Sequence, residues 1–379
     1  MNTVDRLTAL IRNAVTGESI DISDDFDAAF AAVIKTARRH EIAHLAAWAM
    51  LNNGLIKDEN NRKTAEKIVY EASYRDTKNN HAYELACDIL SGAGIQYIPL
   101  KGIVLKKLYP ESWMRSSCDV DILVHKADFK HAVSLFCDRG FELDGDMNFH
   151  DVSLLYDDSN LELHFSICEN MKNIDFVLKK VWENAAPAGE NVYFETNDFF
   201  AFHHIAHMSY HFLAGGCGIR PFLDIWIMRR NDFFDESKVA ELCKTAKIYD
   251  FYSTVMHLTK VWFDGAEHTE LTRKLEKYTL TGGAYGYFPN NAAAYTVRNG
   301  GKVKYLLTLA FPPYRNMKAL YPVLNRFPPL LPFCYVYRVF QKTLGGNSKN
   351  AHKKYDIIKE QDSAFIKEVA SLIKELKLD

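Results

Sequence analysis

The pattern of apolar and polar positions changes twice along the chain. Up to residue 92, apolar residues recur every three or four positions, which is the period of an amphipathic helix. Between 93 and 190, short runs alternate apolar and polar side chains, as strands do, and after 190 the helical period returns. We therefore expect an N-terminal helical region over 1–92, a strand-containing core over 93–190 and a C-terminal helical region over 191–379.

One long helix leads into the expected core, which begins with a short strand. Residues 57–90 predict the helix, and the sequence Ser-Gly-Ala-Gly at 91–94 ends it. Residues 95–100 predict a strand, which leads into a Lys-Gly turn. The elements expected after that turn are a helix at 126–139 and strands at 141–144, 150–156 and 160–167.

A pair of carboxylates lies in an apolar strand within the stretch Arg-Ser-Ser-Cys-Asp-Val-Asp-Ile-Leu-Val at 115–124. Since successive side chains on a strand point to opposite faces, Asp119 and Asp121 share one face, and Val120 and Ile122 take the other. Two adjacent carboxylates repel each other unless a cation lies between them, and Mg²⁺ prefers hard oxygen ligands of this kind. The strand therefore predicts a divalent metal site.

The Lys-Gly turn precedes this strand. Gly102 carries no side chain, so a phosphate can approach its backbone, and Lys101 can add a point charge. The structural alternative is a plain strand-to-helix turn with a solvated lysine. A Lys-Gly pair alone is not specific, but its place shortly before Asp119 and Asp121 favours the phosphate interpretation.

A second polar face lies on the strand expected at 160–167. Glu162 and His164 alternate there with apolar residues, so they share one face as Asp119 and Asp121 do. An exposed face of an antiparallel sheet is the structural alternative.

Arg115, Ser117, Asp119 and Asp121 fill the motif Arg-x-Ser-x-Asp-x-Asp after a glycine turn. In this the chain resembles the polymerase-β-type nucleotidyltransferase superfamily. It is most similar to the family of uncharacterised bacterial nucleotidyltransferases, which shares the motif with abortive-infection-type nucleotidyltransferases. The resemblance implies an α+β fold with a small mixed-sheet nucleotidyltransferase core between helical regions. It also implies a nucleoside triphosphate such as ATP as substrate, two Mg²⁺ or Mn²⁺ ions, and a third carboxylate from a neighbouring strand.

The resemblance also assigns roles to residues of this chain. Glu162 fits the third carboxylate, so that the expected catalytic residues and metal ligands are Asp119, Asp121 and Glu162. His164 is expected to support a metal ligand or to contact phosphate. Further nucleotide contacts are expected from Lys101, Gly102, Arg115 and Ser117.

The motif departs from the superfamily pattern at two points. Ile103 follows Gly102, where a Ser or Thr hydroxyl usually touches a phosphate, and the gap from Gly102 to Asp119 is longer than usual. The missing hydroxyl motivates an alternative from another class, a degenerate nucleotidyltransferase that binds a nucleotide or a partner without turnover.

Three histidines lie on one face of the helix expected within 197–230. His203, His207 and His211 are four residues apart, a spacing that can ligate zinc, although no His-Glu-x-x-His motif supplies a general base. A zinc hydrolase is therefore a third interpretation, and buried, satisfied histidines are the structural one. The resembled family carries a histidine-rich helix, a glycine loop and a later aspartate, which implies that Arg220 and Asp224 lie near the nucleotide cleft.

The composition restricts the partners and the compartment. A formal net charge of −2 argues against a nucleic acid, so the acceptor is expected to be a small molecule or a protein. The 7 cysteines form no Cys-x-x-Cys pair, the N-terminus lacks an apolar secretory segment, and no stretch is long and apolar enough to span a membrane. We therefore expect a cytoplasmic protein.

Two segments stay open to more than one interpretation. Residues 311–340 are rich in aromatic residues and proline, which fits either an interfacial or partner-binding surface or short helices packed on the C-terminal region. His40 and His44 are expected on the surface of a single helix that runs from 26 to 50.

Overall fold

The structure is a computed structural model that describes residues 3–20, 25–145, 150–284, 286–344, 356–360 and 362–378. Four helices lead to the sheet. They are α1 (Thr3–Thr16), α2 (Phe26–Arg39), α3 (Ala43–Asn52) and α4 (Glu59–Gly92). The long helix α4 starts at Asp58, whose side chain accepts hydrogen bonds from the backbone N–H groups of Asn60 and Asn61.

The run from 26 to 50 forms two helices and not the single helix expected from its period. Helix α2 ends at Arg39, and Glu41 adopts a φ of 59°, which a continuous helix does not allow. His40 and His44 therefore lie on either side of a bend, and both are buried, with exposed fractions of 0% and 5%. The expectation of a helix surface was wrong for both histidines.

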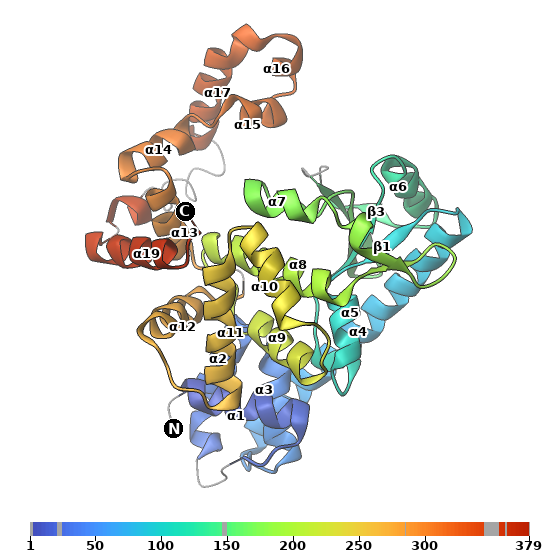
Figure 1. Ribbon diagram of the computed structural model, residues 1–379, viewed down its shortest axis with the longest axis vertical. Coiled ribbons are helices and arrows are strands. Elements are labelled where there is room, and N and C mark those ends of the chain that lie inside the picture. The colour runs from blue at the N-terminus through green and yellow to red at the C-terminus, as the bar shows by residue number, and fades with distance from the viewer. Residues whose placement is uncertain are drawn as a thin grey trace.

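A five-stranded mixed sheet lies on the right of the molecule in Figure 1. Its strands are β1 (Tyr97–Pro99), β2 (Asp119–Val124), β3 (Glu142–Leu143), β4 (Asp151–Tyr156) and β5 (Ser159–His164). The order is β1-β2-β5-β4-β3; β2 and β5 are parallel, and the other pairs are antiparallel. This sheet between helical regions confirms the predicted α+β fold class.

One face of the sheet is apolar and covered. Val120, Ile122 and Leu163 are fully buried in a cluster that also contains residues of α4 and of α6 (Phe129–Asp138). Because side chains alternate along a strand, packing this face against α4 and α6 turns Asp119, Asp121 and Glu162 to the other face.

Of the further elements up to residue 282, helix α8 faces the polar side of the sheet. The elements are α5 (Gly102–Leu105), α7 (Lys172–Leu178), β6 (Ala185–Pro187), β7 (Tyr193–Glu195), α8 (Asn197–Leu213), α9 (Arg220–Arg230), α10 (Glu236–Thr245), α11 (Tyr249–Asp264) and α12 (Glu270–Gly282). Residues of α1–α3 and of α8–α12 share one apolar core, so the first and last helical regions pack together.

The last helices project from this body at the top of Figure 1. They are α13 (Phe288–Arg298), α14 (Lys302–Ala310), α15 (Tyr314–Leu320), α16 (Val323–Arg326) and α17 (Leu331–Leu344), and α19 (Ser363–Glu375) returns to pack on α12 and α13. Segment 311–340, for which two interpretations were left open, forms short helices. Within the described residues, no helix is both long enough and apolar enough to cross a bilayer.

Candidate active site

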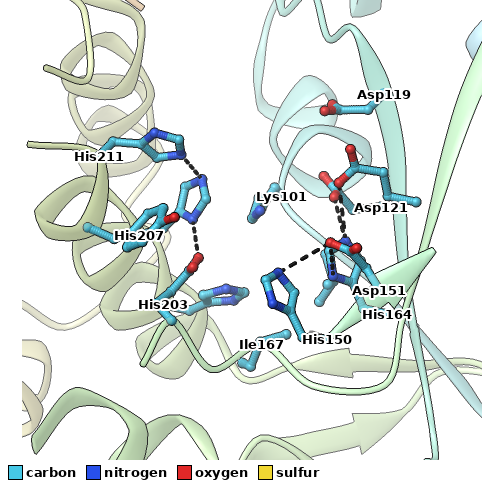
Figure 2. Close-up of a pocket in the computed structure, with 14 residues that line it drawn as sticks. Lys101, Asp119, Asp121, His150, Asp151, His164, Ile167, His203, His207 and His211 are labelled. Atoms are coloured by element: carbon cyan, nitrogen blue, oxygen red, sulfur yellow. Dashed lines mark hydrogen bonds and ion pairs between the residues drawn. The ribbon is translucent and has the colours of Figure 1, made fainter. Parts of the chain in front are cut away.

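Strands β2 and β5 bring three carboxylates into one pocket. Asp121 pairs directly with Glu162 across the parallel strands, and Asp119 lies two residues earlier on the same face of β2. The pocket has a volume of about 270 Å³ (Figure 2). Its lining is Leu100, Lys101, Asp119, Asp121, His150, Asp151, Glu162, His164, Ile167, Glu169, His203, His207, Tyr210 and His211.

The three carboxylates have unequal proton affinities. Burial acts to raise the pKa of Asp121, but the charge of Lys101 and a hydrogen bond from His164 outweigh it and hold that pKa well below its usual range. Burial and the negative charge of Asp121 raise the pKa of Asp119, and burial, Asp121 and Asp119 raise the pKa of Glu162 to about 7. Ionising Asp119 and Glu162 beside the charged Asp121 is therefore unfavourable, and a bound cation would relieve this repulsion.

His164 orients Asp121. Its Nε2 lies 2.9 Å from Asp121 Oδ1, and both side chains are buried. Since the Asp121 carboxylate can only accept, Nε2 carries the proton and donates it. The same nitrogen lies 3.6 Å from Glu162 Oε2.

Lys101 reaches the pocket from a strained turn. Its φ is 38°, an uncommon value for a residue with a side chain, and such strain concentrates at functional sites. Burial acts to lower the pKa of Lys101, but Asp121, Asp119, Glu169 and Glu162 outweigh burial and raise it. The ammonium group therefore stays charged in the pocket, between the carboxylates and the histidines (Figure 2).

Gly102 makes room for the motif serine. A Cβ at this position would lie 3.0 Å from Ser117 Oγ and 3.2 Å from Ser117 Cβ. Ser117 in turn donates a hydrogen bond of 2.8 Å to Asp119 Oδ1. Gly102 and Ser117 themselves do not line the pocket, so Ser117 acts on it through Asp119.

Arg115, Asp224 and Arg220 lie outside the pocket lining. Arg115 Nε forms a buried ion pair of 2.6 Å with Asp224 Oδ1, which also accepts a hydrogen bond of 2.8 Å from Tyr109. Arg220 pairs with Glu41 at 2.5 Å. These contacts attach the loop that precedes β2 to α9, and α9 to the α2–α3 bend. The three residues therefore hold the loop in place without lining the pocket.

The three histidines of α8 face the carboxylates across the pocket (Figure 2). His207 uses both ring nitrogens, Nδ1 with Glu169 and Nε2 with His211, each at 2.9 Å. His203 Nδ1 pairs with Glu195 at 3.0 Å. Because His207 Nε2 is already hydrogen-bonded to His211, and Nδ1 of His203 and His207 to glutamates, this face does not favour zinc.

Four polar lining residues were not proposed from the sequence. Asp151 is the first residue of β4, where it pairs with His164, and its alternation with apolar residues, shared by Ser153, is the signal that could have found it. His150 precedes the strand and no such pattern marks it. Glu169 and Tyr210 lie in a loop and on a helix, and no local sequence pattern distinguishes either.

Comparison with known proteins agrees with the residues of the pocket. The family model described as "uncharacterised nucleotidyltransferase" matches residues 27–264, which is more than half of the chain. The chain belongs to this nucleotidyltransferase family. The match runs from α2 through the sheet and the histidine helix to the end of α11, so the family region contains every lining residue of the pocket. Searches of curated proteins and of solved structures gave no match.

Proposed function

We propose that this nucleotidyltransferase moves a nucleoside monophosphate from a nucleoside triphosphate to a hydroxyl or phosphate group of an acceptor. The observation that carries the proposal is the shared pocket of Asp119, Asp121 and Glu162, which the parallel pairing of β2 and β5 fixes on one face. Family membership independently supports the reaction class.

The donor set fits two divalent metal ions such as Mg²⁺ or Mn²⁺. Asp119, Asp121 and Glu162 would hold them, since carboxylate oxygens are the ligands that these ions prefer. Bound there, the metals would supply charge neutralisation and activation of the attacking oxygen.

The chain's own groups prepare the pocket for a polyphosphate. Lys101 contributes a fixed positive charge beside the carboxylates, and Gly102, which is buried, leaves space for Ser117. Ser117 and His164 hold Asp119 and Asp121 in place, at 2.8 and 2.9 Å respectively. Arg115, Arg220 and Asp224 contribute by holding the loop that carries Ser117.

The acceptor is a small molecule or a protein group, because the chain has a net charge of −2 and no excess of positive charge for a polynucleotide. All seven cysteines lie in the described part of the chain and none forms a disulfide, which supports a reducing compartment such as the cytoplasm, where triphosphates are made.

Thermal unfolding of the wild type and of Asp119→Asn, with each nucleoside triphosphate and with or without Mg²⁺, tests the site. A ligand at a hundred times its dissociation constant stabilises the folded state by about 2.7 kcal/mol, so binding is readily measured. We expect stabilisation that needs nucleotide and metal together and is lost in the variant. Stabilisation without metal, or equal stabilisation of the variant, would contradict the site.

The alternative is a protein that binds nucleotide without transfer, motivated by Ile103 in place of a hydroxyl residue. The presence of Asp119, Asp121 and Glu162 together in one pocket argues for the active enzyme. Metal-dependent binding without any transferred nucleotide, tested with extracts as the source of acceptor, would favour the alternative.

A further inference from the structure

A second group of candidate ligands lies beside the carboxylate trio and contains two histidines. The ligand atoms of His150, Asp151 and His164 all lie within 4.8 Å of one another. His150 Nε2 is 3.2 Å from Asp151 Oδ2, and His164 Nδ1 is 3.9 Å from the same oxygen. All three residues line the pocket (Figure 2).

Two buried atoms of this group lack a partner. His164 Nδ1 and Asp151 Oδ1 make no hydrogen bond, although the exposed fractions of the two residues are 5% and 6%. Leaving buried polar atoms unpaired destabilises a folded protein, so their presence in a pocket points to a ligand.

The hydrogen bond of His164 identifies the kind of ligand. Its Nε2–H donates to Asp121, so Nδ1, which lies 3.9 Å from Asp151 Oδ2, carries the lone pair. A histidine that donates one ring N–H to a carboxylate while its other nitrogen holds a free lone pair is the usual arrangement of a metal-bound imidazole.

We propose that His150, Asp151 and His164 bind a divalent transition metal of the zinc type, in addition to the oxygen-ligated ions of the transferase site. Two imidazoles and one carboxylate suit Zn²⁺, whereas Mg²⁺ prefers oxygen ligands alone. The ligand set excludes Asp119 and Glu162 but includes His164, which contacts Asp121 of the transferase site. Zinc binding by Asp119→Asn therefore distinguishes a failure of this site from a failure of the proposed function. The site would tie the orientation of Asp121 to the bound metal through His164.

Metal analysis of the purified protein after dialysis against Zn²⁺ and excess Mg²⁺ tests this site, with Co²⁺ absorbance as a report of histidine ligation. We expect one equivalent of zinc in the wild type and in Asp119→Asn, and at least a tenfold weaker affinity in His150→Gln and in Asp151→Asn. His131→Gln changes an exposed histidine of α6 and is the matched control. Equal zinc affinity in wild type and His150→Gln, or displacement of zinc by Mg²⁺, would overturn the proposal.

A different observation concerns the projecting helices α14–α17. Met317, Leu324 and Cys334 form a small core of their own in this segment. The opposite face of α17 is apolar and exposed. Its side chains Phe333, Val336, Tyr337 and Phe340 have exposed fractions of 71%, 58%, 56% and 59%. Their spacing of i, i+3, i+4 and i+7 forms one continuous stripe, which we call the α17 stripe.

The charge of this segment identifies what covers the stripe. Between residues 302 and 344 the sequence contains seven Lys or Arg residues and no Asp or Glu, in a chain whose net charge is −2. Large apolar side chains beside an exclusively basic set suit an anionic bilayer surface, where the apolar groups enter the headgroup boundary and the cations meet lipid phosphates. A second copy of the same segment would bring like charges together, and a nucleic acid would not need the apolar stripe.

We propose that α14–α17 dock the protein on an anionic membrane surface through the α17 stripe. Co-sedimentation with phosphatidylcholine vesicles, with and without phosphatidylglycerol, tests this. We expect binding only to the anionic vesicles, weakened by salt and reduced at least tenfold in the variant Phe333→Ser/Phe340→Ser. Phe176→Ser, which changes a Phe on α7 that is 61% exposed, is the control.

Two results would overturn the membrane proposal. One is equal sedimentation with neutral and anionic vesicles, or with neither. The other is a concentration-dependent dimer that the double variant abolishes, because that would assign the stripe to a second copy of the chain. Neither result bears on the transferase pocket, whose residues lie outside this segment.

Discussion

The ion pair between Arg115 and Asp224 provides a sharp test of what the motif arginine does. The 2.6 Å pair has side-chain exposed fractions of 6% and 0%, so neither charge is paired by water. Replacing Asp224 by Asn keeps the shape and leaves the Arg115 charge buried and unpaired. Removing one partner of such a pair costs about 3–5 kcal/mol. We therefore expect Asp224→Asn to lower the free energy of unfolding by about this amount.

Urea denaturation followed by circular dichroism measures this loss, and a surface pair gives the control. Glu368→Gln breaks a pair with Lys277 whose side chains are 41% and 66% exposed, and it should cost less than about 1 kcal/mol. Replacing both Arg115 and Asp224 by apolar residues should recover much of the lost stability, because no buried charge remains. Equal stabilities of Asp224→Asn and Glu368→Gln would refute a structural role for the pair.

The sign of the pH dependence follows from the same pair. Burial acts to raise the pKa of Asp224, but the charge of Arg115 outweighs it, so that the folded pKa lies below the ordinary value. Because the unfolded aspartate binds its proton near pH 3.9, the contribution to stability is complete above that pH. It is lost as the pH falls through the folded pKa, and Asp224→Asn should lack this acid-dependent part.

Three further predictions test the turn and the buried histidines. Lys101→Met should weaken nucleoside triphosphate binding at least about tenfold in calorimetry, because a charge-assisted hydrogen bond contributes about 1.5–3 kcal/mol. Lys107→Met, which changes a lysine outside the pocket, should leave this binding unchanged. Gly102→Ala should destabilise the fold by about 1–3 kcal/mol by overpacking, whereas Gly92→Ala, whose added Cβ meets no atom within 4 Å, should be neutral or stabilising by thermal unfolding. Burial lowers the pKa of His44 to about 4, so that the unfolded state binds a proton at a higher pH than the folded state does. The free energy of unfolding should therefore fall by about 3 kcal/mol as the pH falls from 6.5 to 4. His44→Gln should flatten that part of the stability profile, and an unchanged profile would contradict the burial argument.

The alternation of side chains was enough to predict which residues share a face. It put Asp119 with Asp121, and Glu162 with His164, before any strand pairing was known. The parallel register that places Glu162 opposite Asp121 depends on how α4 and α6 cover the other face, and no local pattern records that. The resemblance to the family, and not the alternation, predicted that Glu162 joins Asp119 and Asp121 as the third carboxylate.

Long-range pairing explains the rest of what the sequence did not reveal. Arg115 and Asp224 are 109 residues apart, and their charges fit a phosphate contact as well as they fit each other. The structure pairs them away from the pocket because the loop before β2 packs on α9. Asp151 likewise became a site residue only through its pairing with His164 across β4 and β5.

Transfer of label from a nucleoside triphosphate tests the central claim most directly. Parallel reactions would carry the label in the α or the γ phosphate, with Mg²⁺ and cell extract as the source of acceptor. The account predicts that wild-type protein transfers the α label with release of pyrophosphate, and that Glu162→Gln and Asp119→Asn each reduce the rate at least about 100-fold, a change in barrier of about 2.7 kcal/mol. Transfer of the γ label instead, or α-label transfer at the wild-type rate by either variant, would contradict it.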